Sequence, residues 1–118
     1  MPAKEMMVIQ KWEDMIDYGY TALRQYPKSE KYALAAETRE AMWEIGTFLV
    51  QANAMRAKGL RYRNLENADH ALAKLKILVR AGHRLSFLPH QKYKHWSGLN
   101  IEVGKLVGGW MSATSKSQ

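Results

Sequence analysis

The basic side chains between Ala71 and Leu85 are the residues of this 118-residue chain that are best placed to do chemistry. In the segment ALAKLKILVRAGHRL they recur at intervals of four, three and one, as Lys76, Arg80, His83 and Arg84. At 3.6 residues per turn they share one side of a helix, and an apolar set falls on the other side: Leu72, Leu75, Leu78, Val79, Gly82 and Leu85. Cations displayed along one helix face attract polyanions, so the segment predicts a surface that contacts phosphates or an acidic partner.

A second basic group surrounds the segment LRYRN at residues 60–64, which we expect to connect two helices. Its members are Arg56, Lys58, Arg61 and Arg63, with Tyr62 among them. Basic residues interleaved with an aromatic ring can hold phosphates while the ring stacks on a base. The alternative is a set of cations that face the dipole at a helix C-terminus, followed by a loop. This alternative explains Arg56 and Lys58 better than Arg61 and Arg63.

Patterns that would indicate an enzyme or a metal site are weak. Glu37, Glu40 and Glu44 lie about one helical turn apart, which favours a solvated helix edge over an acid–base pair. No glutamate has a histidine three residues later, as di-iron helical bundles require. His90 and His95 are five residues apart and do not share a helix face, and the chain has no cysteine and no phosphate-binding P-loop. We therefore expect no catalytic residues, no cofactor and no metal.

Four amphipathic helices are predicted to position these groups, over residues 7–25, 30–57, 65–87 and 89–113. Proline after Tyr26 ends the first helix, Ser29 is the expected N-cap of the second, and Gly59 is its expected C-cap. Pro89 fits the first turn of the fourth helix, where its missing N–H is tolerated. Helices of this length joined by short turns predict an all-α fold, an antiparallel up-down-up-down four-helix bundle that forms one domain over residues 1–118.

Gly104, Gly108 and Gly109 lie close together in the second half of the predicted fourth helix. Each costs about 0.5–1 kcal/mol relative to alanine inside a helix. The cost is unexpected unless another backbone approaches closely at these positions. We therefore expect Gly104 and Gly108, together with the inward-facing Trp110, to mark close helix packing within the bundle or against a second subunit.

The net charge of +7 is unevenly distributed along the chain. Residues 1–54 hold six Lys/Arg against eight Asp/Glu, a balance of −2, whereas residues 55–118 hold twelve against three, a balance of +9. A basic half favours a polyanionic partner, nucleic acid before an acidic membrane or protein, although a solubilising surface is the alternative. The absence of cysteine and of any long apolar run predicts a soluble cytoplasmic protein that does not enter a membrane.

Three segments carry a resemblance to a known family: YPKSEKY at residues 26–32, ALAKLKILVR at residues 71–80 and NIEVGKLVGGW at residues 100–110. Together they resemble the accessory variability determinant (Avd) proteins of diversity-generating retroelements. They also resemble the related four-helix-bundle proteins of the 23S rRNA intervening-sequence group. The resemblance extends over about residues 9–111, and the ending E-x-G-x-x-x-G-x-W is its most specific part.

The resemblance implies a four-helix bundle that assembles into a ring-shaped homopentamer without enzyme activity of its own. It implies association with the retroelement reverse transcriptase, the template RNA and the cDNA during mutagenic copying. It places Lys76 and Arg80 on the basic helix of the family, where these partners are contacted. Arg84, Lys58, Arg61 and Arg63 extend that patch by our interpretation of this sequence. The alternative is an RNA- or protein-binding module of the 23S rRNA intervening-sequence group that has no reverse-transcriptase partner.

Overall fold

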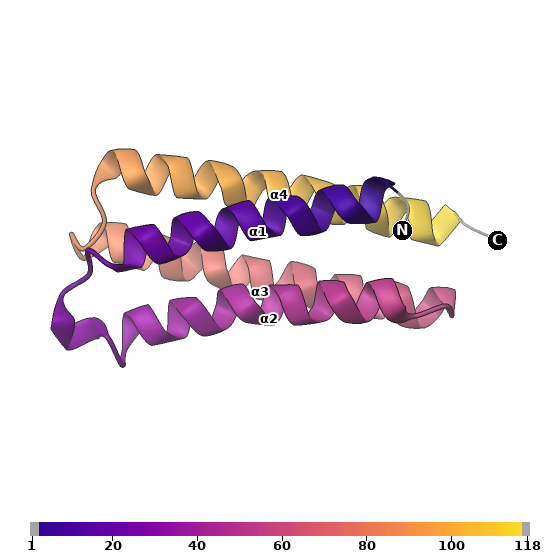
Figure 1. Ribbon diagram of the computed structural model, residues 1–118, viewed down its shortest axis with the longest axis horizontal. Helices are drawn as coiled ribbons and strands as arrows, with labels where there is room; N and C mark the ends of the chain where they lie inside the picture. Colours follow the sequence, from indigo (N-terminus) through magenta and orange to yellow (C-terminus); the bar gives the residue numbers. More distant parts are fainter. Residues whose placement is uncertain (1–2, 117–118) are drawn as a thin grey trace.

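The computed structural model describes residues 3–116, with side chains from Glu5 onward, and contains four long helices. They are α1 (Ala3–Leu23), α2 (Leu34–Ala54), α3 (Lys58–Arg84) and α4 (His90–Lys116), and a short 3-10 helix, η1 (Lys28–Glu30), precedes α2. The helices run alternately up and down along the 49 Å axis of the molecule (Figure 1). The predicted all-α four-helix bundle is confirmed.

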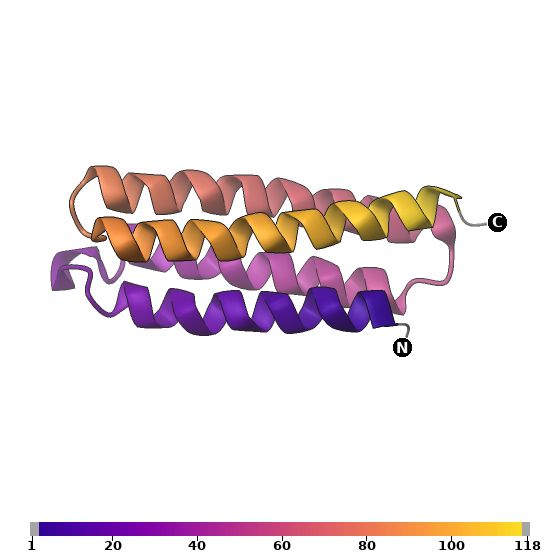
Figure 2. The same cartoon turned by 90° about the horizontal axis from the view of Figure 1, so that it is seen from above.

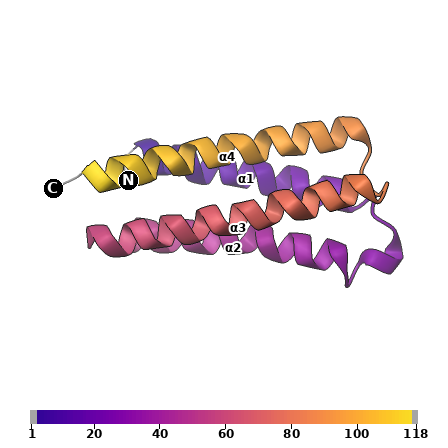
Figure 3. The ribbon, with the colours of Figure 1, turned by 180° about the vertical axis from the view of Figure 1, so that it is seen from behind.

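Each helix packs on two neighbours, so the four form a closed square in cross-section. α2 packs on α1 and α3, and α4 packs on α3 and α1. Figure 2 shows the α1–α2 and α3–α4 turns together at one end of the bundle, with both termini and the α2–α3 turn at the other. The view from behind in Figure 3 shows the same division. Residues far apart in sequence therefore meet at each end.

The apolar stripe predicted for residues 71–85 is confirmed except at its last member. Leu72, Leu75, Leu78, Val79 and Gly82 are buried, as predicted. Leu85 was expected to be buried with them but is 52% exposed, because α3 ends at Arg84. Leu85 is the C-cap of α3, and the chain then reverses at Ser86, which has a φ of 67°. The amides of Phe87 and Leu88 donate to the Gly82 carbonyl at 2.9 and 3.2 Å, and Leu88 takes a buried position.

The connection between α2 and α3 is shorter and earlier than the sequence predicted. Residues 60–64 were expected to form it but lie within α3, and the chain instead turns at residues 55–57. Met55 and Ala57 are extended, with ψ of 127° and 124°. Gly59, expected as the C-cap of α2, lies in the first turn of α3 and has no positive φ. The end of α2 is stabilised by a side chain, described below, and needs no left-handed glycine.

The connection between α1 and α2 also differs from the prediction. The second helix begins at Leu34 instead of residue 30, because η1 occupies residues 28–30. Ser29, expected as the N-cap, therefore lies inside η1, and it is the Glu30 Oε1 atom that accepts a hydrogen bond from the Leu34 amide at 3.2 Å. Pro89 was expected inside the fourth helix but directly precedes α4, and its carbonyl accepts the Tyr93 amide at 2.9 Å. The fourth helix continues to Lys116, beyond the predicted end at residue 113.

Tryptophan fills the interface between α1 and α2, which pack less closely than α2 and α3 do. The Trp12 indole N–H donates to the Met42 carbonyl at 2.9 Å, and the ring lies over Gly46, where a Cβ atom would collide with it. The Trp12 ring also contacts Trp43 edge-on, with centroids 5.6 Å apart. The glycine and the two tryptophans together fix the distance between α1 and α2.

Candidate nucleic-acid interface

Three cations on the C-terminal half of α3 lie on the outside of the bundle. Lys76, Arg80 and Arg84 are exposed, and the leucines of the same helix segment are buried behind them. Successive members are four residues apart, so each follows the previous one by about 6 Å along the helix axis. We call these three residues the cationic stripe. Apart from Leu85 and His83, the structure therefore places both sides of the amphipathic segment as the sequence predicted.

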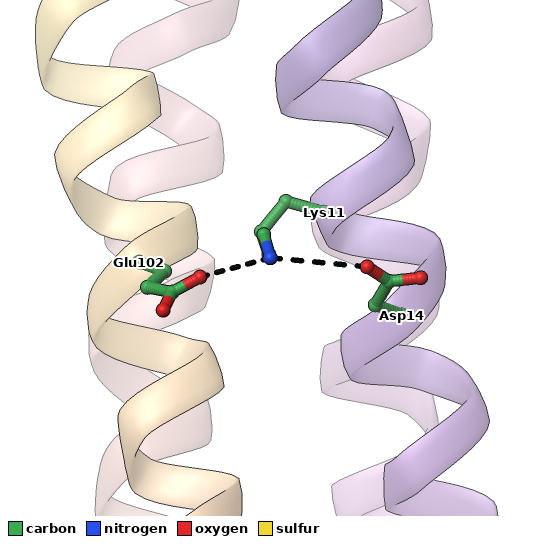
Figure 4. Close-up of polar contacts among 3 residues, drawn as sticks. All are labelled: Lys11, Asp14 and Glu102. Atoms are coloured by element: carbon green, nitrogen blue, oxygen red, sulfur yellow. Dashed lines mark ion pairs between the residues drawn. The ribbon is translucent and has the colours of Figure 1, made fainter.

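The cationic stripe is not neutralised within the chain. Lys76, Arg80 and Arg84 form no ion pair and no side-chain hydrogen bond with any other residue in the described part of the molecule. Lys11 provides the contrast, because its ammonium joins α1 to α4 through Glu102 at 2.9 Å and lies 3.9 Å from Asp14 (Figure 4). The hydrogen bond and the charge of Glu102 hold the pKa of Lys11 above its ordinary value of 10.5.

The spacing of the cations in the cationic stripe lowers the stability of α3. Like charges four residues apart destabilise a helix by about 0.2–0.5 kcal/mol per pair, and the stripe contains two such pairs. The dipole at the C-terminus of α3 favours Arg84, but this effect is confined to about the last turn and does not extend to Lys76. The spacing is therefore better suited to a polyanion than to the stability of α3.

The chain segment that carries the cationic stripe lacks acidic residues over a long stretch of sequence. No Asp or Glu occurs between Asp69 and Glu102, a segment that contains six Lys/Arg and all four histidines of the chain. This segment comprises the C-terminal part of α3 and the first part of α4, which pack together as antiparallel neighbours. Lys74 and Lys94 are exposed on the same segment and were missed by the sequence analysis. The signal that could have found them is the long gap in the acidic residues, not helical spacing.

His83 belongs to the packing between α3 and α4 and not to the cationic stripe. Its ring stacks on Tyr93, with centroids 4.3 Å apart and an interplanar angle of 15°. The ring of His90 lies 5.6 Å away, centroid to centroid. His83 is half-buried in this aromatic group, whereas the helical wheel grouped it with Lys76, Arg80 and Arg84.

The second basic group lies at the opposite end of α3, and one of its members, Arg61, has a structural role. The Arg61 guanidinium donates from Nη2 to the Met55 carbonyl at 2.7 Å, and from Nε to the Met55 and Ala52 carbonyls at 3.1 and 3.3 Å. The Ala52 carbonyl lies in the last turn of α2 and also accepts the Met55 amide at 3.3 Å, and Met55 is the C-cap residue of this helix. Carbonyls at a helix end lack the regular intrahelical donors, and the guanidinium supplies donors there. Arg61 thus caps α2 from the first turns of α3.

The remaining members of this group do not join the cationic stripe. Arg63 is exposed, and Lys58 lines a cavity of about 350 Å³ together with Gly59, Tyr62 and Ser115. From Arg63 to Lys76 the helix rises by about 20 Å. Two exposed acidic residues of α3, Glu66 and Asp69, lie between them. Within one chain, the six cations predicted as one interface therefore form two separate groups.

The predicted glycine positions on α4 differ from one another in their surroundings. A Cβ atom at Gly104 would lie 3.2 Å from Leu72 Cδ2 and 3.7 Å from Lys76 Nζ, so this glycine gives α3 room to pack. A Cβ atom at Gly108 would meet nothing within 4 Å. Trp110 is buried in the bundle core. Close packing inside one chain thus accounts for Gly104 and Trp110 but leaves the exposed Gly108 without a contact.

No three His, Asp or Glu side chains in the described part of the chain lie close enough together to hold a metal ion. None of the helices within residues 3–116 combines the length and the apolar character that crossing a membrane requires.

Comparisons with known proteins agree with this architecture. The structure is similar to a crystal structure of a protein of unknown function from the S23 ribosomal protein family of Bacteroides thetaiotaomicron VPI-5482, with a TM-score of 0.84. The two chains are 13% identical, and the match covers 92% of this chain and 98% of that chain, so the likeness concerns the fold. A comparison with curated protein sequences gives no match. The bAvd-like family model matches residues 6–114, and the chain therefore belongs to the bAvd-like family.

Proposed function

We propose that this protein is a non-catalytic accessory factor of a diversity-generating retroelement, which binds the reverse transcriptase and the template RNA or cDNA during mutagenic copying. Membership of the bAvd-like family supports the retroelement context. The observation that carries the nucleic-acid contact is the cationic stripe, since its three cations are exposed and have no ionic partner among the described residues.

Binding through the cationic stripe is proposed to be largely independent of nucleic-acid sequence. The stripe presents two guanidinium groups and one ammonium group from one helix face, and such groups bind phosphate oxygens, which every nucleotide carries. Contacts of this kind position a nucleic acid and depend strongly on salt. The role we assign is therefore to hold the template near the polymerase, and the choice of template belongs to other components.

The experiment compares two double variants of matched charge in the presence of the reverse transcriptase and template RNA. Lys76→Ala with Arg80→Ala removes two members of the cationic stripe, and Lys105→Ala with Lys116→Ala removes two exposed cations of α4. We expect the first pair to lose most of its co-purification with RNA or polymerase, and the second pair to retain it. Equal retention by both variants, with unchanged helix content, would refute the assignment of Lys76 and Arg80.

We propose further that the protein acts as a ring-shaped homopentamer and that Gly108 lies against a second copy. A glycine on an exposed helix face reduces helix stability by up to about 1 kcal/mol, which a close approach between subunits would explain. Native mass spectrometry of the intact particle tests the subunit number. A Cβ atom at Gly108 would meet nothing within 4 Å, so we expect Gly108→Trp to give smaller particles with unchanged helix content. A particle of unchanged mass would argue against this contact.

A second candidate is an RNA- or protein-binding bundle without a reverse-transcriptase partner. The structural likeness to an S23-family protein supports this second candidate. A reverse-transcriptase gene and an adenine-mutated repeat beside the gene for this protein would support the retroelement role. Their absence, together with RNA binding by the purified protein, would support the second candidate instead.

A further inference from the structure

A cavity of about 250 Å³ opens beside the turn that joins α1 to α2, at the end of the bundle opposite the termini (Figure 1). Three buried side chains, Leu23, Tyr26 and Ala35, form its apolar wall. Four cations line the same cavity: Arg24, Lys28, Lys31 and Arg39. This cavity, which we call the turn cavity, is on a different pair of helices from the cationic stripe.

The concentration of charge in the turn cavity is unusual for this half of the chain. Residues 1–54 contain six Lys/Arg against eight Asp/Glu, yet four of the six cations line this one cavity. No acidic residue among those described lines it. Glu30 lies in the same turn, but one of its carboxylate oxygens accepts the Leu34 amide at 3.2 Å. Four cations around an apolar wall without a carboxylate favour an anionic ligand.

Arg39 is already positioned for such a ligand. Its Nη2 atom donates to the Lys31 carbonyl at 2.9 Å, which ties α2 to the segment after η1. A guanidinium has five N–H donors, so four remain for a planar or tetrahedral oxyanion. Lys31 is held more weakly, because its Nζ atom lies 5.5 Å from the centroid of Tyr32, whose ring is 86% exposed. Its ammonium can turn toward a bound anion at little cost, since exposed cation–π contacts contribute only about 0.5–1 kcal/mol.

The size of the turn cavity limits the ligand. Pockets for complete drug-sized molecules span about 300–1,000 Å³, so a cavity of about 250 Å³ is large enough for a small anionic group such as a phosphate. Tyr20 and Arg39 also line a neighbouring groove of about 540 Å³ between α1 and α2. The two hollows therefore adjoin at these two side chains, and one ligand with an anionic end and a second, larger part can span both.

The neighbouring groove has the features of a stacking surface. Trp43 lines it and is 49% exposed, and its ring is held by the edge contact with Trp12 and by a hydrogen bond from its Nε1 atom to the Tyr20 hydroxyl at 2.8 Å. Nucleobases stack on such rings without regard to sequence. Glu40 and Glu44 line the same groove. Their carboxylates would repel a second phosphate, so the backbone of a nucleic acid cannot continue through the groove.

We propose that the turn cavity and its neighbouring groove bind a nucleoside monophosphate, either free or as the phosphorylated end of an RNA or DNA strand. The phosphate lies among Arg24, Lys28 and Arg39, and the base lies against Trp43. This site is independent of the cationic stripe. It recognises one terminal phosphate with its base, whereas the stripe contacts a continuous backbone.

The experiment measures binding to the full chain by calorimetry with AMP, adenosine and inorganic phosphate. We expect AMP to bind at least tenfold more tightly than either of the other two, because each of them fills only one of the two hollows. Four-nucleotide strands with a 5′ phosphate, a 3′ phosphate or no phosphate then distinguish the sources. Tighter binding of a phosphorylated strand than of AMP identifies a strand end, and the reverse order identifies a free nucleotide.

Matched variants separate this site from the rest of the surface. Arg24→Gln with Lys28→Gln alters two exposed side chains, so we expect an unchanged helix content and AMP affinity reduced at least tenfold. Trp43→Leu should reduce AMP affinity about tenfold and leave phosphate affinity unchanged. Lys105→Gln with Lys116→Gln removes the same charge elsewhere and should change affinity less than twofold.

Three results would overturn the proposal. The first is equal affinity for AMP and adenosine. The second is wild-type AMP affinity in the double variant Arg24→Gln with Lys28→Gln. The third is a loss of AMP binding in the double variant Lys76→Ala with Arg80→Ala. The last variant tests the proposed function separately, because it should lose RNA and retain AMP.

Discussion

The two ends of α3 carry the same kind of side chain and use it differently. At the N-terminal end, the Arg61 guanidinium donates to the Ala52 and Met55 carbonyls and so closes α2. At the C-terminal end, Arg80 and Arg84 are exposed and have no ionic or hydrogen-bonding partner among the described residues. A cluster of cations in a sequence therefore does not show which of them can reach a ligand.

The two ends are also anchored to the bundle by different interactions. Charge-assisted hydrogen bonds from Arg61 hold the N-terminal end against α2. At the C-terminal end, the buried Tyr26 ring packs so closely on Gly82 that a Cβ atom there would collide with the Tyr26 hydroxyl. That hydroxyl has no hydrogen-bond partner among the described residues, and burial raises the pKa of Tyr26 to about 12. The C-terminal anchor is thus a neutral side chain, which leaves the cations of that end available.

The largest expected effect is the loss of the Tyr26 anchor in alkali. The pKa of Tyr26 is about 12 when folded, against 10.0 for an ordinary tyrosine, so the folded state favours the neutral phenol. The contribution of Tyr26 to the free energy of unfolding is fully present below pH 10 and is lost as the pH rises toward 12. At about 1.4 kcal/mol per pKa unit, the loss amounts to about 2–3 kcal/mol.

Denaturant unfolding of the wild type and of Tyr26→Phe between pH 9 and 12 measures this effect. Lysine titration affects both proteins equally, so the difference between them isolates Tyr26. At pH 7 the Phe variant should be at least as stable as the wild type, because it removes a buried hydroxyl without a partner. Parallel loss of stability in the two proteins over this range would mean that Tyr26 ionises as it does in solvent.

The next effect concerns the N-terminal anchor. Arg61→Ala should lower the free energy of unfolding by about 2 kcal/mol, because hydrogen bonds to a charged group contribute about 1.5–3 kcal/mol and the Ala52 and Met55 carbonyls lose the guanidinium donor. Arg63→Ala, two residues away and exposed, should change it by less than about 0.5 kcal/mol. Chemical denaturation of the two variants makes the comparison. Equal destabilisation would show that Arg61 does not cap α2.

The smallest effect inserts a carboxylate into the cationic stripe. Ile77 is 63% exposed and lies one residue after Lys76 and three before Arg80. Ile77→Glu should weaken binding of single-stranded RNA about fivefold, since one unit charge at contact distance in water is worth about 1 kcal/mol. Ile77→Gln is the neutral control and should bind as the wild type does in a fluorescence anisotropy titration. A similar loss in both variants would assign the effect to the Ile77 side chain and not to charge.

The sequence predicted much of the fold because helical periodicity reports burial directly. Leu72, Leu75, Leu78 and Val79 are buried on α3 as predicted, and Trp110 is buried on α4 as predicted. The turns were less predictable, because tertiary hydrogen bonds fix them. Gly59 resembled a helix end, but the end of α2 depends on Arg61, which lies six to nine residues later in the chain.

The two candidate sites were also predictable to different degrees, because one lies on a single helix and the other depends on a folded turn. The exposure of Lys76, Arg80 and Arg84 follows from one helix and its leucines, so helical spacing sufficed. The turn cavity is lined by Arg24 from the turn after α1, Lys28 from η1 and Arg39 from α2. These residues lie in the half of the chain whose net charge is negative, so a charge balance by halves does not reveal them. Only the folded turn brings these three residues together.

The salt dependence of RNA binding shows most directly whether the cationic stripe contacts the phosphates of a nucleic acid. Each phosphate contact to a single strand contributes about 0.7 to the slope of log K against log salt. If Lys76, Arg80 and Arg84 each contact one phosphate, replacing all three by alanine should reduce the magnitude of this slope by about 2 per protomer. An unchanged slope, with the variant folded and the affinity retained, would contradict the account and leave the cationic stripe without a role in binding nucleic acid.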